Sequence, residues 1–408
     1  MSEDNPRLTI LGKLVLLAFV AACLYGAWLF LRPQLGRILS SSAAPLPSTS
    51  PSPGDGGFLS RFGEPPAAEI GIAYGTEKKR WLEWAGAEFA KTKEGERIKV
   101  NLVPMGSLEG AQAVLAGDER LHVWSPASAL YKETFVQEWG VGHSGNPILR
   151  EEALALTPMV FVLWAERHGA FRAKLGPVGF DTVARALAER SGWAGIAGKP
   201  EWGLFKFGHT HPNDSNSGLM TLVLMAYEFH EKSRGLELED VLDPGFQAWM
   251  ADFERGVSGL SNSTGTMMRD MVLRGPSTYD GLFVYENVVI DYLKSAEGRW
   301  GELRVEYPKR NMWNDNPYYV LDVPWSSADQ RKAAGRFLEH LLSVPVQQRS
   351  LEHGFRPGNP EVPVKAAGSP FLAYQKFGLK PDIGEICEAP RPEVMTNLLA
   401  SWQRTRGR

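Results

Sequence analysis

An alternation of strand-like and helix-like segments between residues 69 and 128 constrains the fold more than any other feature of this chain. Apolar runs that predict strands occur at Ile70 to Ala73, Arg97 to Met105 and Leu121 to Ser128. Helical patterns fill the spaces between them, over residues 77–91 and 107–116. Strands and helices that alternate at this spacing predict an α/β fold with a parallel sheet. Because ligands of such sheets bind beyond the carboxyl ends of the strands, we expect residues 75–78 and 125–128 on one rim.

The rest of the chain continues the same alternation, and its 408 residues suggest two or three domain-sized units. Strands are predicted over residues 155–164 and 202–207 and twice within 304–325, and a strand joins a helix over 279–292. Further helices are predicted over residues 180–189, 244–255, 263–273 and 326–343, with a short one that ends at Gly354.

A polar turn precedes a long apolar helix within the stretch from His209 to Phe229. Hydroxyl and amide side chains fill the turn from Asn213 to Gly218. The free N–H groups at the start of a helix favour an anion or a polar acceptor, by roughly 0.3–1 kcal/mol when exposed. Taken alone, the turn is more simply explained by Ser215 or Ser217 capping the helix. Whether the turn binds a ligand therefore depends on where it lies in the fold.

Composition excludes two classes of protein. The net charge is −3 and no basic stripe is present, so we expect no nucleic-acid partner. The chain has only two cysteines, Cys23 and Cys387, which lie near opposite ends of the sequence. No disulfide framework is expected, although this does not exclude an exported location.

The N-terminal region predicts attachment to a membrane. After a polar segment, 1–13, the uncharged run 14–31 reaches the lower limit for a helix that spans a bilayer. We interpret it as a transmembrane anchor or a signal, and Val20 to Cys23 also resembles the lipobox of bacterial lipoproteins. Residues 32–66 are rich in Ser, Pro and Gly and predict a linker. We expect a protein of the cell membrane, with its binding domain outside the cytoplasm.

The C-terminal stretch AAGRFLEHLLSVPVQQRSLEHGFRP, residues 333–357, resembles that of bacterial extracellular solute-binding proteins of the type II periplasmic-binding fold. Molybdate-, sulfate- and phosphate-binding proteins belong to this group. The resemblance implies an α/β protein of two lobes joined by two crossover strands, here preceded by a transmembrane helix, and no enzymatic activity. The first lobe would comprise residues 67–155 and 313–385 and the second 156–312, with 386–408 as a C-terminal extension.

The same resemblance implies a cleft for a small polar solute, with an oxyanion as one candidate. The loops that would contact the ligand place Thr76, Glu77, Ser125, Ser128, Ser215, Asn216, Ser217, Tyr279 and Asp280 at the cleft. We add Glu286, which could equally be a surface residue at a helix start. Because Glu77, Asp214, Asp280 and Glu286 would repel an anion, an amine, a sugar or a cation also stays open as the ligand.

Several alternative functions remain at this point. His209, His211 and Asp214 carry ligand types that suit zinc, but three candidates without a further Cys or His cluster make a weak metal site. Ser215 with His209 could be imagined as a nucleophile and base, yet no hydrolase signature is present. We therefore expect no cofactor. The expected partner is the permease of an ABC-type importer, and the alternative is another membrane partner of an anchored sensing or assembly domain.

Overall fold

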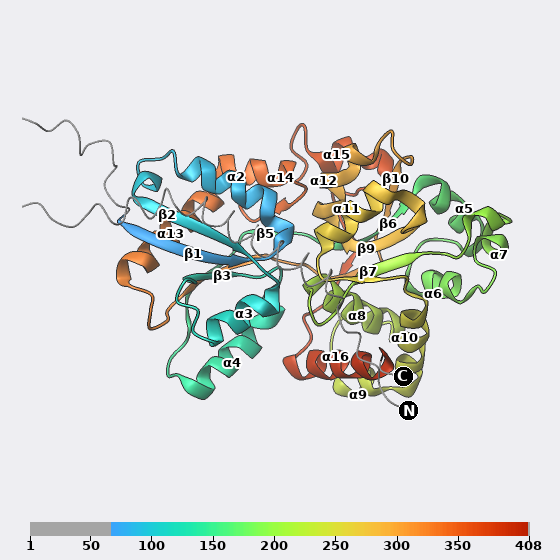
Figure 1. Cartoon of the computed structure of the whole chain (residues 1–408), viewed down its shortest axis with the longest axis horizontal. Helices are drawn as coiled ribbons and strands as arrows, with labels where there is room; N and C mark the ends of the chain where they lie inside the picture. The colour runs from blue at the N-terminus through green and yellow to red at the C-terminus, as the bar shows by residue number, and fades with distance from the viewer. Residues whose placement is uncertain (1–66, 407–408) are drawn as a thin grey trace, which may run out of the picture. The chain divides into compact units, whose positions relative to one another are not determined.

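Two five-stranded sheets form the framework of the computed structural model, which describes residues 67–406 (Figure 1). The first sheet has the order β2-β1-β3-β12-β4. Its strands are β1 (Ala68–Tyr74), β2 (Ile98–Pro104), β3 (Val123–Ser125), β4 (Ile148–Ala153) and β12 (Pro317–Leu321). β1 pairs in parallel with β2 and with β3, which confirms the predicted parallel arrangement. β12 runs antiparallel between β3 and β4.

The second sheet has the order β10-β6-β9-β7-β8. Its strands are β6 (Met159–Trp164), β7 (Phe207–Thr210), β8 (Leu260–Ser261), β9 (Gly281–Tyr285) and β10 (Leu303–Glu306). Every residue of β6 and β9 is buried, because helices cover both faces of this sheet. Each sheet with its helices is one lobe, so the described chain has the two-lobed α/β architecture.

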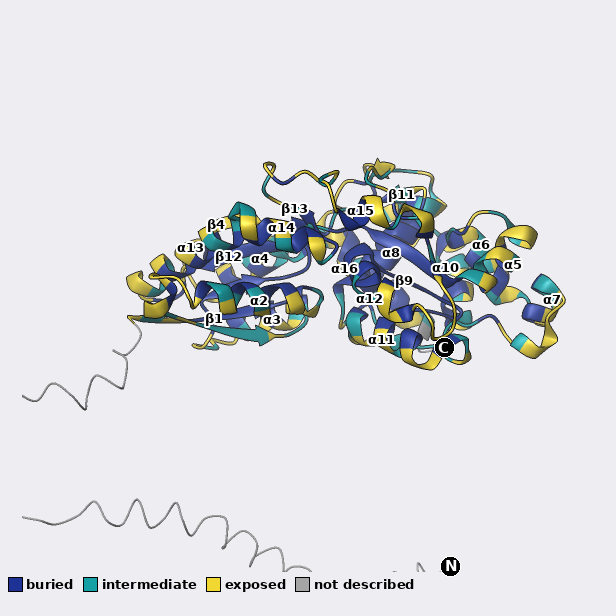
Figure 2. Cartoon of the chain, turned by 90° about the horizontal axis from the view of Figure 1, so that it is seen from above, coloured by how far each residue is buried: buried dark blue, intermediate teal, exposed yellow. Residues whose placement is uncertain are grey.

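Helices surround each sheet. Those of the first lobe are η2 (Thr76–Lys78), α2 (Lys79–Phe89), η3 (Gly95–Arg97), α3 (Ser107–Leu115), η4 (Ala129–Tyr131), α4 (Lys132–Gly142), α13 (Ala328–Leu342) and α14 (Val344–Glu352). Those of the second are α5 (Ala165–Leu175), α6 (Phe180–Ala188), α7 (Trp193–Ala197), η5 (Pro200–Trp202), α8 (Asn216–Phe229), α9 (Leu238–Leu242), α10 (Pro244–Gly256), α11 (Thr264–Arg274), η6 (Gly275–Ser277) and α12 (Glu286–Ala296). α8 is buried along almost its whole length (Figure 2).

Two short crossover segments join the lobes. The first runs from β4 through β5 (Ala155–Leu156) into β6, and the second runs from β11 (Arg310–Asn311) into β12. The two segments lie side by side, because Thr157 and Asn314 form an antiparallel bridge between them. β5 also pairs with β13 (Arg356–Pro357). The hinge between the lobes is therefore built from backbone pairs as well as side chains.

The chain after Pro357 packs against the second lobe, whereas we expected residues 313–385 in the first. It forms α15 (Pro370–Ala373), η7 (Gln375–Phe377), β14 (Glu385–Ile386) and α16 (Pro392–Arg406). Val362, Phe371, Phe377 and Leu379 belong to the core cluster of the second lobe. α16 packs on α8, α9 and α10. The apolar pattern of this segment predicts burial, but the hydrophobic effect has no direction and does not specify the lobe.

The strand predicted over residues 202–207 is wrong. Pro200–Trp202 form a turn of 3-10 helix, and β7 begins only at Phe207. Gly203 has a φ of 70°, which turns the backbone out of the extended conformation, and Leu204 is exposed. Trp202 and Leu204 therefore lie in or beside this turn, whereas Phe205 and Phe207 are buried in the core.

No helix within residues 67–406 is long and apolar enough to cross a membrane. The predicted anchor, 14–31, and the predicted linker, 32–66, lie outside the described residues.

Candidate ligand-binding cleft

A cavity of about 470 Å³ lies between the two lobes. The first lobe contributes Gly75, Thr76, Glu77, Pro104, Met105, Gly106, Ser107, Leu108, Glu109, Gln112 and Ala127. The second contributes Asn213, Asp214, Ser215, Asn216, Asn262, Ser263, Thr264 and Tyr285. A Cβ placed on Gly106 would lie 3.0 Å from the backbone oxygen of Asp214, so the lobes already touch at one edge of the cavity.

The helices α3, α8 and α11 are among those that begin at this cavity. Their N-cap residues are Gly106 for α3, Ser215 for α8 and Ser263 for α11, and all three line the cavity. The N–H groups of a helix's first turn have no partner within the helix, and the helix dipole makes this end positive. The cavity therefore combines hydroxyl and amide side chains with the positive ends of helix dipoles from both lobes.

Four of the residues predicted from the sequence line the cavity: Thr76, Glu77, Ser215 and Asn216. Ser215 does not cap α8 with its side chain; its hydroxyl lies 3.1 Å from that of Ser217. The simpler interpretation of this turn as a helix cap therefore does not hold for Ser215. Asn216 is buried, and its Oδ1 has no hydrogen-bond partner within the described residues.

Two of the predicted residues lie behind the cavity wall. Ser217 is fully buried, and its hydroxyl contacts those of Thr210 at 2.5 Å and Thr264 at 2.6 Å. It links the starts of α8 and α11. Ser125 is fully buried as well and does not line the cavity. The hydroxyl of Ser128 accepts a hydrogen bond from Leu130 N at 3.3 Å, and Ser128 lines a neighbouring cavity.

The structure does not bring Tyr279, Asp280 or Glu286 to the cavity. Tyr279 and Asp280 precede β9, whereas Tyr285 at its carboxyl end lines the cavity. The Asp280 carboxylate accepts hydrogen bonds from Arg167 Nε at 2.9 Å, Trp193 Nε1 at 3.0 Å and Lys206 N at 2.8 Å. Tyr279 and Asp280 lie at the amino end of this strand, and the apolar pattern does not show which end faces the other lobe.

Glu286 follows Tyr285 directly but points away from the cavity. Its carboxylate accepts two hydrogen bonds from Arg356, at 2.8 and 3.0 Å, and one from the Tyr307 hydroxyl. Glu286 is fully inaccessible and Arg356 is buried, whereas Tyr307 is half-buried. The pair joins α12 to β13, so Glu286 is neither the surface residue nor the ligand contact that the sequence left open.

Several lining residues were missed from the sequence although a signal for them existed. Ser263 and Thr264 form a Ser/Thr-rich helix start like that of α8, and Gly106 with Ser107 starts α3. Tyr285 also lines the cavity, and its hydroxyl accepts a hydrogen bond from Asn216 Nδ2 at 2.9 Å. Burial raises the pKa of Tyr285 well above its ordinary value, so this hydroxyl stays protonated.

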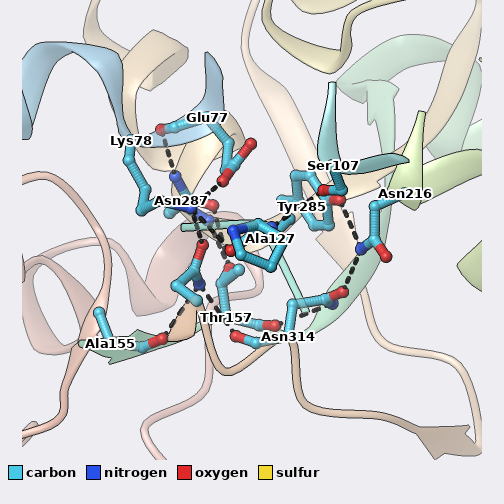
Figure 3. A network of polar contacts seen from close by, with 12 residues as sticks. Glu77, Lys78, Ser107, Ala127, Ala155, Thr157, Asn216, Tyr285, Asn287 and Asn314 are labelled. Carbon is cyan, nitrogen blue, oxygen red and sulfur yellow. Dashed lines mark hydrogen bonds and ion pairs between the residues drawn. The ribbon is translucent and has the colours of Figure 1, made fainter. Parts of the chain in front are cut away.

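A polar network connects the cavity to the hinge (Figure 3). Asn216 Nδ2 donates to Asn314 Oδ1 at 2.7 Å, and Asn314 Nδ2 donates to Thr157 O at 3.1 Å. Thr157 Oγ1 donates to Asn287 Oδ1 at 3.1 Å, and Asn287 Nδ2 donates to the backbone oxygen of Glu77 at 3.3 Å. The last of these bonds crosses from the second lobe to the first. Cavity residues of both lobes are thus hydrogen-bonded to the two crossover segments.

The histidines that were weighed as metal ligands do not converge. His209 is fully buried; its Nδ1 lies 2.8 Å from Thr210 O and its Nε2 lies 2.8 Å from Glu254 Oε1. His211 pairs instead with Asp214 at 3.1 Å. Within the described chain, no three His, Cys, Asp or Glu side chains gather as a metal-ligand set. With both ring nitrogens in hydrogen bonds, His209 is not placed to act as a base for Ser215 either.

Comparisons with known proteins agree with this architecture. The sequence model of a family described as bacterial extracellular solute-binding protein matches residues 70–356. A search of curated proteins found no match. Among solved structures, the sulfate-binding protein SubI from Mycobacterium tuberculosis H37Rv is similar, with 15% identity, a TM-score of 0.53, and coverage of 78% of this chain and 93% of that one.

Two further structures are similar to the same extent. A periplasmic thiamin binding protein has 11% identity and a TM-score of 0.56, with 83% of this chain and 96% of that chain covered. A structure described as an ABC transporter from Clostridium perfringens ATCC 13124 has 13% identity and a TM-score of 0.51, with 82% and 99% covered. Identities this low show a shared fold and leave the ligand undetermined.

Proposed function

This chain belongs to the family of bacterial extracellular solute-binding proteins, and from that premise we propose that its cleft clamps a small organic solute that carries a negatively charged oxygen group. The observation that carries the proposal is the meeting of three helix N-termini, those of α3, α8 and α11, at one cavity. N–H groups and hydroxyls there can hold an anionic oxygen without a positively charged side chain in the cavity. The family is one of binding proteins, not of enzymes.

The size of the cavity favours an organic solute over a bare inorganic oxyanion. The cavity has a volume of about 470 Å³. It keeps this volume although the lobes touch at Gly106 and Asp214. Cavities of roughly 300–1,000 Å³ are typical of sites for small organic ligands.

The unpartnered Asn216 Oδ1 indicates a second property of the solute. Both hydrogens of the Asn216 amide group are used, on Tyr285 and on Asn314. Its buried oxygen can accept one more hydrogen bond, and a buried acceptor without a partner costs about 1–3 kcal/mol. A hydroxyl or N–H group on the solute would supply that bond. We therefore expect a solute with an anionic group and at least one hydrogen-bond donor.

We propose that the protein, once it has bound its solute, delivers the solute to the permease of an ABC-type importer. The similar structure described as an ABC transporter supports this role, and so does the family. We also propose that residues 14–31 tether the chain to the membrane and that residues 32–66 hold the binding domain away from it, outside the cytoplasm.

The proposal can be tested by the thermal unfolding of the purified full chain in the presence of sulfate, citrate, glycerol 3-phosphate, glycerol, maltose and thiamine. An anionic compound should raise the melting temperature most, because a ligand present at 100 times its Kd stabilises the folded state by about 2.7 kcal/mol. Anionic compounds that also carry a hydroxyl, such as citrate and glycerol 3-phosphate, should exceed sulfate.

A variant with an added negative charge tests whether anionic compounds stabilise the protein by binding in the cavity. Asn262→Asp adds a negative charge at the start of α11 and should weaken binding of an anion by about tenfold, equal to 1.4 kcal/mol. Asn397→Asp makes the same change at a half-buried position of α16 that does not line the cavity, and it should leave binding unchanged. If no anionic compound stabilised the protein, or if both variants bound equally well, the proposed function would be refuted.

A further inference from the structure

Glu77 poses a difficulty for an anionic ligand, since it lines the cavity together with Glu109 and Asp214. The carboxylates of Glu109 and Asp214 each have a partner nearby in the sequence. Glu109 Oε2 accepts a hydrogen bond from Gly106 N at 3.0 Å, and Asp214 pairs with His211 at 3.1 Å. Glu77 is different because its side chain is only 6% exposed, and a desolvated carboxylate repels an anion more strongly than an exposed one.

Lys78 lies directly behind Glu77, and its side chain is fully buried. Its ammonium group donates hydrogen bonds to Glu77 Oε1 at 2.6 Å, to Pro126 O at 3.0 Å and to Asn316 Oδ1 at 3.1 Å (Figure 3). Three acceptors use all three hydrogens of an ammonium group. Lys78 does not line the cavity, so it acts on a ligand only through its neighbours.

The backbone next to Glu77 is shaped to let its carboxylate fold back toward Lys78. A Cβ placed on Gly75 would lie 2.4 Å from Glu77 Oε1 and 2.5 Å from Oε2. Any other residue at position 75 would therefore push the carboxylate out of this place. The acceptors at Pro126 and Asn316 come from the loop after β3 and from the second crossover segment, and they prevent the ammonium group from swinging away.

We propose that Lys78 is a positioning residue that determines the charge selectivity of the cleft: it holds the Glu77 carboxylate away from the ligand and cancels its charge, so that the helix N-termini can bind an anion. This inference rests on the proposed function. Asp315 is a second acid near Lys78, and it is occupied by a hydrogen bond from Ala129 N to its Oδ1 at 2.9 Å. Unlike Asp315, Glu77 lines the cavity, so the charge whose cancellation matters for a ligand is that of Glu77.

Four variants of the full chain test the inference by titration calorimetry with sulfate, citrate and glycerol 3-phosphate as probes. Lys78→Met leaves Glu77 as an uncompensated charge and should weaken binding of the best probe by about tenfold or more. Glu77→Gln leaves the cation uncompensated and should strengthen binding several-fold. The double variant restores neutrality and should bind within about threefold of the wild type. Lys91→Met removes an exposed lysine of the same lobe and should change nothing.

A merely structural role for Lys78 gives a different result. In that case the double variant would bind as weakly as Lys78→Met, because both lack the bonds to Pro126 and Asn316. That result overturns the inference, and so does unchanged binding by Lys78→Met. If Lys78→Met does not fold, the affinity of Glu77→Gln for the probes tests the inference instead. Weaker anion binding by Glu77→Gln than by the wild type contradicts charge cancellation. A wild-type chain that binds none of the three probes overturns the proposed function, and the inference with it.

Discussion

Two glycines in the first turns of α8 and α11 occupy similar places in their helices but meet different surroundings. A Cβ placed on Gly218 would lie 2.4 Å from Thr210 O and 2.7 Å from Pro212 N, both of which are backbone atoms. Gly265 has no atom within 4 Å of the same position. α8 can therefore approach the loop before it only because Gly218 has no side chain, and this approach sets the position of Asn216 in the cavity.

Gly218→Ala should lower the free energy of unfolding by about 2–3 kcal/mol, because backbone atoms cannot move aside as a flexible side chain would. Gly265→Ala should raise it by about 0.5–1 kcal/mol, since alanine is the better helix former. Urea denaturation followed by tryptophan fluorescence measures both. Equal changes in the two variants would show that the close approach of α8 to residues 210–212 is not what requires glycine.

At the scale of elements, a single carboxylate fastens the edge strand β10 to α5. Glu306 Oε1 lies 2.9 Å from His168 Nε2 and 2.9 Å from Arg172 Nη1. The hydrogen bond with His168, together with the charge of Arg172, lowers the pKa of Glu306 below its usual value of 4.5. A carboxyl group whose folded pKa is lowered contributes stability that is fully present above the unfolded pKa and is lost as the pH falls through the folded one.

Glu306→Gln should therefore reduce the free energy of unfolding by about 1–2 kcal/mol at pH 6 and by less at pH 3, because this contribution declines once the pH falls below the unfolded pKa. Urea denaturation at the two pH values gives the difference. Glu138→Gln, on the exposed face of α4, serves as the control and should change stability by less than about 0.5 kcal/mol at both. The same loss for Glu306→Gln at pH 3 and pH 6 would contradict a charged anchor.

At the scale of the whole molecule, Asn316 holds the two crossover segments together. Its Nδ2 donates to Ala155 O and to Asn314 O, both at 3.0 Å, and its Oδ1 accepts from Lys78. Its φ of 44° places it in the left-handed region, which asparagine tolerates better than most residues. Together with Asn287, whose side chain donates to the backbone oxygen of Glu77, this residue couples the two lobes.

Asn316→Ala should lower the free energy of unfolding by about 3 kcal/mol, because it leaves buried partners unsatisfied and forces a positive φ on alanine. Asn316→Gly loses the same hydrogen bonds without the backbone strain, so its loss should be smaller by about 1 kcal/mol. Urea denaturation gives both values, and solution scattering should show a larger radius of gyration for both variants. Identical losses would mean that the backbone at position 316 is not strained.

Local patterns in the sequence were enough to predict the main elements and part of the site. The alternation of strands and helices between Ile70 and Ser128 led to the parallel strands of the first sheet, because the periodicity of burial is a property of neighbouring residues. The polar turn before α8 led to Ser215 and Asn216 in the same way, since the free N–H groups of a helix start depend only on local backbone. The C-terminal stretch carried the resemblance to the family.

Tertiary structure alone decided the remaining features, and each depends on residues far apart in the chain. Which end of β9 faces the other lobe determines that Tyr285, and not Tyr279 or Asp280, lines the cavity. The partner of Glu286 is Arg356, and the ammonium group of Lys78 reaches Asn316. Apolar burial is non-directional and a charge does not specify its partner, so sequence patterns predict that a residue is buried but not what it meets there.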